Sequence, residues 1–576
     1  MKIIIAKTAG FCMGVRRAVE MALDAASKQP GPICTFGPLI HNPQVLDLLK
    51  EKGISTLDEI PDRAAGTVII RAHGIPPESR DALEKAGFNV IDATCPRVIK
   101  VQTIIRKHAR EGYGIIIIGD EDHPEVVGLL GYAGDAGHVA NNLEALEALP
   151  NFEKAIIVAQ TTQNTAFFEK VRKLATDRHP QYKVFETICD STQKRQDEIS
   201  RLARDVDAVV VVGGHTSGNT QRLAQIARQT GKPAQAVETE AELDSNMLLT
   251  ARSVALTAGA STPNWVTNRV YRTIENLADT RHPGLKALAL KTQRMLMLTS
   301  IYVAVGAGFL CYTCNKLQGI THHRPYILMS VLYVLSMHLL NHLTGRADDR
   351  YKDPERARFH TRHQTVLTTL ALTAGAGGLL TAYNLGWKLF LLLLVMSAAG
   401  LLYNIKLIPF CREDRRYRSI RDIPGSKTVL ISLAWGIVTA LLPHMAAVGH
   451  WDPGSIVVFT GAVGLVFVRT AFFDILDMQA DRIVGRETIP ILMGENRVIA
   501  LLKIFCGVIV LLLLGAGAMG WISSLGFFLS ICQASLLAVL TAYEHGHLLP
   551  SNRLEFLVDT HFILAGTIAL VWTALS

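Results

Sequence analysis

The chain has 576 residues and a formal net charge of +8. That length is too great for one hydrophobic core, so we expect two or more domains. Charged residues occur throughout residues 1–290, whereas long apolar blocks follow residue 296. The net charge averages two unlike halves and gives no sign of a nucleic-acid partner, so we predict none.

The first half begins with a pattern typical of an α/β protein. Short β-branched runs predict buried strands and alternate with helical segments; the runs are KIIIA, TVIIRAH, YGIIIIGD, KAIIVAQ and DAVVVVGG. No cleavable signal peptide is expected, because MKIIIAKTAGFCMGVRRAVEM has a short apolar run and carries Arg16 and Arg17 early. We therefore predict a soluble α/β unit here.

Three cysteines each end an extended run just before a basic helical segment: Cys12, Cys95 and Cys189. Thiols at helix N-termini near arginine or lysine are expected to have lowered pKa values and to be available as thiolates. Three ligands are too few for a structural zinc site, which needs four protein ligands. They suit an iron–sulfur cluster with one iron open to substrate. Three unrelated core cysteines are the alternative.

Three histidines lie beside proline or glycine just after apolar runs, where strand-end loops build sites. They are His41 in GPLIHNPQV, His73 in VIIRAHGIPPE and His123 in GDEDHPEVVG. Their imidazole N–H groups can bind an anion, and metal ligation is the competing interpretation. Glu125, two residues past His123, is the candidate proton donor. A solvated loop carboxylate is an equal alternative for Glu125.

Small and hydroxyl residues follow the later strands. VVVVGGHTSGNTQRLAQIA opens a helix after a buried strand and offers Ser217 and Asn219 as phosphate donors near a helix N-terminus. VAQTTQNT adds Thr161 and Thr162, and ALTAGASTPNW adds Ser261. Glycine-rich strand-to-helix turns are common, so each segment alone is a weak indication.

In order, these segments resemble the 4-hydroxy-3-methylbut-2-enyl diphosphate reductase family over residues 1–280. The matching motifs are G-F-C-x-G-V, L-I-H-N, R-A-H-G, D-A-T-C-P, H-P-E-V-x-G, Q-T-T, T-I-C, S-x-N-T and T-A-G-A-S-T-P. The resemblance implies a three-lobed α/β fold around a 4Fe-4S cluster held by Cys12, Cys95 and Cys189. It implies that Glu125 is the proton source, that Thr161 helps to relay the proton, and that the diphosphate contacts His41, His73, His123, Ser217, Asn219 and Ser261.

One position departs from the family. A second serine is usual where this chain has Gly218. One hydrogen bond to the diphosphate is therefore expected to be lost, or replaced by the backbone or water. This change bears on affinity and hardly on the reaction.

The reaction that the resemblance implies is reductive dehydroxylation, the last step of the methylerythritol phosphate route to isoprenoids. Iron polarises the allylic C–O bond, Glu125 protonates the leaving oxygen, and two electrons then give isopentenyl and dimethylallyl diphosphate. Residues 1–280 contain no Gly-x-Gly-x-x-Gly, so electrons are expected from a ferredoxin- or flavodoxin-like partner. A metal-sensing or phosphosugar-binding module is the alternative from another class.

Nine apolar blocks in the second half have lengths near the roughly 20 residues that a membrane-crossing helix needs. They are 297–315, 326–343, 365–384, 388–408, 428–447, 455–474, 499–519, 521–543 and 558–575. Basic residues crowd the segments after the second, fourth and sixth blocks. By the positive-inside rule the first half and these loops face the cytoplasm. We predict a multi-pass protein of the cell inner membrane, in contact with the lipid bilayer.

Three aspartates in FFDILDMQADRIVGRETIPILMG, Asp474, Asp477 and Asp481, are spaced to share one face of a helix. Carboxylates gathered this way can hold Mg²⁺, which binds diphosphates, and a solvated helix end is the alternative. Together with LLYNIKLIPF and nine spans, this motif resembles the UbiA-type prenyltransferase superfamily over residues 290–576. The resemblance implies two aspartate motifs that hold Mg²⁺ and a prenyl diphosphate, which ionises and alkylates an acceptor.

The first of these motifs is altered. Its pattern N-D-x-x-D-x-x-x-D appears as NHLTGRADD, in which Asn341 and Asp349 match, but His342 and Gly345 stand where aspartates are usual. Four neighbours are candidates to compensate, the first two as carboxylates and the others by binding phosphate directly: Asp348, Asp353, Arg350 and Lys352.

We therefore predict a multidomain, bifunctional enzyme. Residues 1–280 form the three-lobed reductase domain, residues 281–296 a linker, and residues 297–576 an all-α transmembrane bundle of nine helices. The alternative is that the C-terminal half is a non-catalytic membrane anchor. The altered first motif favours the anchor, and the intact second motif favours a transferase whose acceptor is a lipid or quinone-like molecule.

Overall fold

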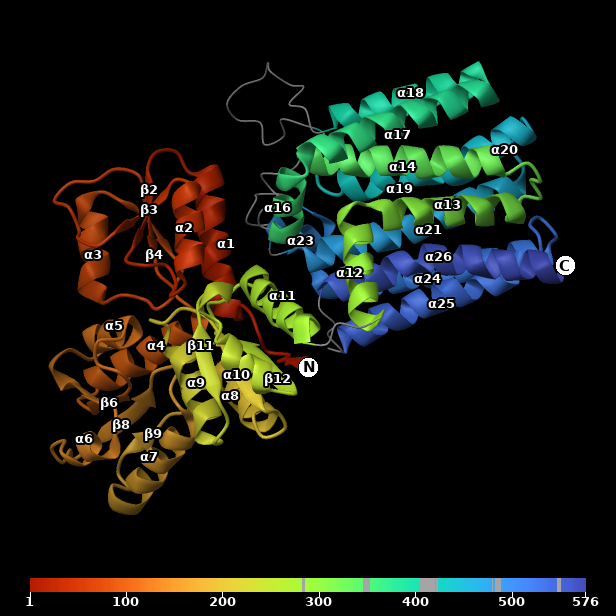
Figure 1. Cartoon of the computed structure of the whole chain (residues 1–576). Helices are drawn as coiled ribbons and strands as arrows, with labels where there is room; N and C mark the ends of the chain where they lie inside the picture. Colours follow the sequence, from red (N-terminus) through yellow and green to blue (C-terminus); the bar gives the residue numbers. More distant parts are fainter. Residues whose placement is uncertain are drawn as a thin grey trace. The chain divides into compact units, whose positions relative to one another are not determined.

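The computed structural model describes residues 1–281, 285–344, 353–403, 420, 423–478, 480–481, 488–545 and 551–576. The chain divides into two compact units, Met1–His282 and Pro283–Ser576. Within the described residues, every strand lies in the first unit, and the second unit is helical (Figure 1).

Three parallel sheets of four strands each form the first unit. Their strand orders are β3-β2-β4-β5, β7-β6-β8-β9 and β1-β12-β10-β11. The strands are β1 (Lys2–Ile5), β2 (Ile33–Phe36), β3 (Ile54–Leu57), β4 (Thr67–Ile70), β5 (Asn89–Asp92), β6 (Gly114–Ile118), β7 (Gly137–Ala140), β8 (Ala155–Ala159), β9 (Lys183–Val184), β10 (Ala208–Val212), β11 (Ala234–Val237) and β12 (Ser253–Ala258).

The third sheet takes its fourth strand from the start of the chain. Strand β1 pairs in parallel with β12, with Lys2 opposite Ser253 and Ile5 opposite Leu256. All three sheets then have the same order, in which the first strand lies between the second and third and the fourth flanks the third. The lobes are thus three copies of one arrangement, and equivalent loops follow equivalent strands.

Helices on both faces explain why the central strands are uninterrupted apolar runs. In the middle sheet, Ile115 and Ile117 pack against α4 and α5, whereas Ile116 and Ile118 pack against α6 and α7. The helices of the first unit are α1 (Met13–Lys28), α2 (Pro43–Glu51), α3 (Pro77–Ala86), α4 (Pro96–Arg110), α5 (Pro124–Ala133), α6 (Leu143–Glu147), α7 (Thr165–Arg178), α8 (Asp190–Leu202), α9 (Gly218–Gln229), α10 (Ser245–Thr250) and α11 (Asn264–Arg281).

The second unit is a bundle of apolar helices. Its described residues include seven helices that are long and apolar enough to cross a membrane, or eight if the pair α12–α13, bent by 78°, is one span. Helix α18 is apolar too, but has only 16 residues. The chain is therefore a membrane protein, and the ninth span stays a prediction. The helices are α12 (Leu285–Leu298), α13 (Ile301–Leu317), α14 (Arg324–Thr344), α16 (Pro354–Arg362), α17 (Gln364–Leu385), α18 (Trp387–Leu402), α19 (Ser426–Gly436), α20 (Leu442–Ala447), α21 (Pro453–Leu476), α23 (Ile489–Met493), α24 (Glu495–Ala518), α25 (Leu525–Glu544) and α26 (Ser551–Leu575).

Most of the segment expected to be a linker, residues 281–296, is helical. Helix α11 runs to Arg281, and α12 begins at Leu285. The boundary between the two units falls between these helices, at His282 and Pro283.

Candidate active site

The three predicted ligand cysteines occupy equivalent positions in the three lobes. Cys12, Cys95 and Cys189 each follow the fourth strand of a sheet and are the N-cap residues of α1, α4 and α8. Each cysteine N–H donates to a carbonyl two residues past the third strand of its sheet, at 3.0 Å in all three cases: Ala260, Ala72 and Thr161. One repeated backbone contact therefore positions all three thiols.

The thiols also lie near one another. A Cβ added at Gly14, two residues after Cys12, would lie 2.4 Å from the Cys95 sulfur. Burial raises the pKa of Cys95, and the charges of Cys12 and Cys189 raise it further, although backbone N–H groups of α4 lower it. The expectation of a lowered pKa is therefore wrong for Cys95, because burial and the neighbouring thiols outweigh the lowering by the helix N-terminus.

The sulfur donors fit a cluster better than a single ion. Zinc–sulfur bonds of about 2.3 Å place thiolates of one zinc site within about 4 Å of one another. Among the described residues, the two groups of possible ligands whose donor atoms all lie within 4.8 Å contain no cysteine; they are His41, His73 and His123, and His215, Glu238 and Glu242. The three thiols are also partly exposed, whereas the other described cysteines are buried.

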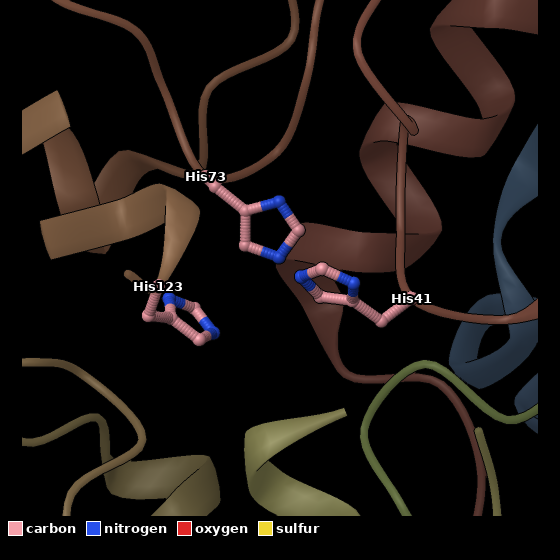
Figure 2. Close-up of side chains that lie close together, drawn as sticks. All are labelled: His41, His73 and His123. Atoms are coloured by element: carbon pink, nitrogen blue, oxygen red, sulfur yellow. The ribbon is translucent and has the colours of Figure 1, made fainter. Parts of the chain in front are cut away.

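The three histidine side chains lie close together in one cluster (Figure 2). The ring centres of His41 and His73 lie 4.6 Å apart, and the His123 ring is 5.6 Å from each. His41 and His73 lie in the loops after β2 and β4, and His123 is the N-cap of α5. Loops that follow strands of two adjacent lobes thus build one imidazole cluster.

These imidazoles are neutral near pH 7. Burial, followed by repulsion from neighbouring cations, lowers the pKa of His41 and lowers that of His123 to about 4. The same causes lower the pKa of the more deeply buried His73 well below its usual range. His123 Nδ1 accepts the Glu125 N–H at 3.1 Å, so its Nε2 carries the proton. In the described part of the chain, His41 Nε2 and His73 Nδ1 have no hydrogen-bond partner, as expected of groups that await a ligand.

Glu125 is a buried carboxyl bound to the loop after β8. The Thr161 N–H donates to one of its oxygens at 2.6 Å, and the Thr161 hydroxyl donates to the other at 2.8 Å. Burial raises the pKa of Glu125 to about 7, and the two bonds from Thr161 oppose this rise. A carboxyl with this pKa can hold a proton near neutral pH and give it up to a reacting group.

A third group of polar side chains surrounds the start of α9. Ser217 is its N-cap and accepts the Thr220 N–H at 3.4 Å. Asn219 is only 4% exposed, and neither polar atom of its side chain has a partner among the residues described. A Cβ at Gly218 would lie 3.6 Å from the His123 ring, so Gly218 adjoins the imidazole cluster. Ser261 is buried in the loop after β12.

The lobe symmetry joins the cysteines to this polar pocket. His73 directly follows Ala72, and Ser261 directly follows Ala260, the carbonyls that accept from Cys95 and Cys12. Thr161, which accepts from Cys189, also holds Glu125. A pocket residue therefore lies at or beside each cysteine's backbone partner, which brings sulfur donors, proton donor and anion ligands into one site.

Sequence reasoning missed several residues of this site. Arg71 interacts electrostatically with all three histidines; its place two residues before His73 was the available signal. Gln160 accepts the Asp120 N–H at 3.1 Å and donates to Thr162 at 2.9 Å, bracing the loop after β8. The buried Arg195 also approaches the cysteines, and no local pattern marks it.

The predicted Mg²⁺ ligands of the second unit are only partly brought together. Asp474 Oδ1 lies 3.1 Å from Lys427 Nζ, and the Thr428 hydroxyl donates to Asp474 Oδ2 at 2.6 Å. The Lys427 ammonium also interacts electrostatically with Asp477 and Asp481. Asp474 thus has a cation and a hydroxyl as partners, and the same ammonium also interacts with the other two aspartates.

The altered first motif lies partly outside the described residues, and Asp349 is among the residues left out. Asn341 and His342 lie in the last turn of α14, and the His342 and His360 rings are 5.6 Å apart. Asp353 is the N-cap of α16, where it accepts the Arg356 N–H at 3.2 Å. Asp353 therefore has a capping role in this structure.

Comparisons with known proteins match a different family to each half of the chain. Residues 3–275 match the family model described as LytB protein, and residues 301–554 match that of the UbiA prenyltransferase family. The 4-hydroxy-3-methylbut-2-enyl diphosphate reductase of Geobacter sulfurreducens is 42% identical over 275 residues, which are 48% of this chain and 97% of that protein. The reductase of Solidesulfovibrio magneticus is 45% identical over 285 residues, 48% of this chain and 100% of that protein.

Two solved structures also match, one for each half. The reductase from Plasmodium falciparum gives a TM-score of 0.45 at 30% identity, covering 47% of this chain and 87% of that one. A UbiA homologue from Archaeoglobus fulgidus, bound to DMAPP and Mg²⁺, gives a TM-score of 0.33 at 15% identity, covering 48% and 97%. From the matches in sequence, the chain belongs to the 4-hydroxy-3-methylbut-2-enyl diphosphate reductase family through its first half and carries a UbiA prenyltransferase domain in its second.

Proposed function

We propose that the first unit converts 4-hydroxy-3-methylbut-2-enyl diphosphate into isopentenyl and dimethylallyl diphosphate by reductive removal of the hydroxyl group. The observation that carries this proposal is a set of buried polar atoms without protein partners in the described residues, on His41, His73 and Asn219, beside the carboxyl of Glu125. Such atoms are rare in folded proteins unless a ligand satisfies them. A phosphate-bearing substrate supplies many acceptor oxygens for such N–H groups.

Cys12, Cys95 and Cys189 would hold a 4Fe-4S cluster in this unit. Three spaced, partly exposed thiols are the donor set that such a cluster with one open iron requires. When bound, the cluster supplies the electrons and a Lewis-acidic iron for cleavage of the allylic C–O bond. We assign delivery of the electrons to a ferredoxin- or flavodoxin-like partner in the cytoplasm.

The side chains of the chain itself bind the substrate and move the proton. The neutral histidines, Ser217, Asn219 and Ser261 bind the diphosphate and fix the substrate's orientation. Glu125 holds a proton for the leaving hydroxyl, because burial keeps its pKa near 7. Thr161 fixes the rotamer of Glu125 through its hydroxyl and its backbone N–H.

Anaerobic purification of the full chain tests the first half of the proposal. We expect a brown protein that contains iron and acid-labile sulfide and bleaches in air. Serine in place of Cys12, Cys95 or Cys189 is expected to lower the iron content strongly, whereas serine at Cys34, a buried strand residue, leaves it unchanged. A colourless wild-type protein that contains zinc would refute the reductase and favour a metal-sensing module.

We also propose that the second unit transfers a prenyl group from a prenyl diphosphate to an acceptor at the membrane. The match to the UbiA family and the spacing of Asp477 and Asp481 in the sequence, which suits Mg²⁺ ligands, support this activity over a passive anchor. In this proposal the chain crosses the cell inner membrane with nine helices and keeps the reductase in the cytoplasm.

Release of pyrophosphate tests the transferase. The full chain in membranes is incubated with dimethylallyl diphosphate and Mg²⁺, with or without a lipid extract as the source of acceptor. We expect Mg²⁺-dependent release that alanine at Asp477 or Asp481 abolishes. Release that both alanine variants retain, or none from the wild-type chain with any extract, would leave the membrane anchor as the explanation.

A further inference from the structure

Arg195 is a buried cation beside the cysteine site. It lies in α8, six residues after Cys189, and is only 4% exposed. Its guanidinium donates to three backbone carbonyls, those of Gly10 at 2.7 Å, Ala258 at 3.2 Å and Thr8. Two of these carbonyls lie in the loop that leads to Cys12. Helix α8 is thereby tied to the loop before another cysteine.

In the part of the chain that the structure describes, no carboxylate forms an ion pair with Arg195. Among the described residues, its contacts are neutral carbonyls, and its Nε is buried without a hydrogen-bond partner. Glu198, a carboxylate that interacts electrostatically with Arg195, accepts hydrogen bonds from Lys7 and Thr8 instead. A charge in this position is expensive unless negative charge lies close by.

The missing negative charge is on the cysteines. Arg195 interacts electrostatically with Cys12 most strongly, then with Glu198 and with Cys189. As thiols, the cysteines are neutral and leave the guanidinium with only the distant attraction of Glu198, which is not within ion-pair distance. As thiolate ligands of a metal centre, they carry the charge that balances it.

We propose that Arg195 is the built-in counter-charge of the metal centre and sets how readily that centre is reduced. This inference rests on the proposed iron–sulfur centre. Each electron that the centre accepts adds one negative charge, and a fixed cation in a low-dielectric site stabilises that charge. Arg195 is a positioning residue, since it acts on the centre through charge and through the loop before Cys12.

Arg97 provides a matched control. It follows Cys95 by two residues, but its guanidinium is paired with Asp190 at 2.5 Å, and both side chains are largely exposed. Such a pair contributes little, because solvent screens it. Removing Arg97 therefore removes a cation near the same cysteines without removing an unbalanced buried charge.

The test is a redox titration of the purified full chain under anaerobic conditions, followed by visible and electron paramagnetic resonance spectra. For Arg195→Gln we expect the equilibrium ratio of reduced to oxidised centre, at a fixed potential, to fall at least tenfold, which is about 59 mV for one electron. For Arg97→Gln we expect a change of less than twofold. A full complement of iron in Arg195→Gln together with an unchanged ratio overturns the inference.

Arg195→Lys keeps the test decisive if the glutamine variant does not fold. Lysine preserves the charge but loses the fork of contacts to several carbonyls. A lower melting temperature together with an unchanged ratio of reduced to oxidised centre supports the charge role. If the melting temperature and this ratio both fall, although the charge is kept, Arg195 has a structural role only. A wild-type chain without iron overturns the proposed function itself, so the two failures are distinguishable.

Discussion

The pKa of Glu125 links burial to catalysis. Because burial raises this pKa to about 7, the fraction of Glu125 that holds a proton falls as the pH rises through neutrality. We predict that kcat/KM declines above about pH 7 and that Glu125→Gln lowers kcat at least about 100-fold. Thr161→Val removes a hydrogen bond that lowers this pKa. The decline in kcat/KM of this variant should therefore begin at a higher pH than in the wild-type chain. Steady-state rates with a chemical reductant, compared at equal iron content, measure both effects.

The same group makes stability depend on pH. A carboxyl whose pKa is higher in the folded chain stabilises the fold below its ordinary pKa, and this contribution is lost as the pH rises through about 7. Between pH 5 and pH 8 the wild-type melting temperature should therefore fall further than that of Glu125→Gln, which cannot ionise. Parallel curves for the two proteins would contradict the raised pKa.

An added side chain is expected to fit at Gly218 but to clash at Gly14. A Cβ at Gly218 meets the His123 ring at an ordinary 3.6 Å, so Gly218→Ser fits and adds a hydroxyl to the anion pocket. One hydrogen bond is worth about 0.5–1.5 kcal/mol, so we predict a KM lowered roughly 2- to 10-fold with little change in kcat.

A Cβ at Gly14 would meet the Cys95 sulfur at 2.4 Å. Gly14→Ala should therefore lose iron. Substrate titration of the first variant and iron analysis of the second decide the two cases.

At the scale of single elements, we propose different roles for the three aspartates at and just after the end of α21. Asp474 forms an ion pair with Lys427 and a hydrogen bond with Thr428, so Asp474→Asn should remove both contacts with the carboxylate and lower the melting temperature of the membrane-bound chain. Asn at Asp477 or Asp481 should instead leave the fold intact and weaken Mg²⁺-dependent pyrophosphate release at least tenfold. Mn²⁺ binding, followed by electron paramagnetic resonance, checks the metal directly. Equal loss of binding in all three variants would contradict this division.

Much of the site was predictable because its residues lie in the loops that follow strands. Buried parallel strands are uninterrupted β-branched runs in the sequence, so the ends that carry Cys12, His41 and His123 were visible. Contacts between distant segments were not visible. The pairing of Lys427 with Asp474 and of Arg195 with the loop before Cys12 depends on how helices pack. The length of α18, with 16 residues, falls short of a typical span, so apolar composition alone did not settle the number of spans.

The whole molecule joins a unit that makes five-carbon diphosphates, as proposed, to one that uses a prenyl diphosphate. Since each unit is compact by itself, we predict that residues 1–282, expressed alone, retain iron and the reductase kcat within about twofold. Sedimentation after cell lysis should leave this fragment in the supernatant and the full chain in the membranes. A fragment that loses its iron would show that the helical unit is needed for the reductase fold.

Strand β1 is synthesised long before its partner β12, which is the last strand of the unit. At about 5–20 residues per second, a ribosome needs on the order of 10–50 seconds to make the stretch between them. The two lobes built from consecutive segments can close during this interval, while the lobe that contains both ends stays open. The reductase thus completes its folding just as the first apolar helices emerge, so a bulky tag on Met1 should impede the final pairing at the moment of membrane insertion.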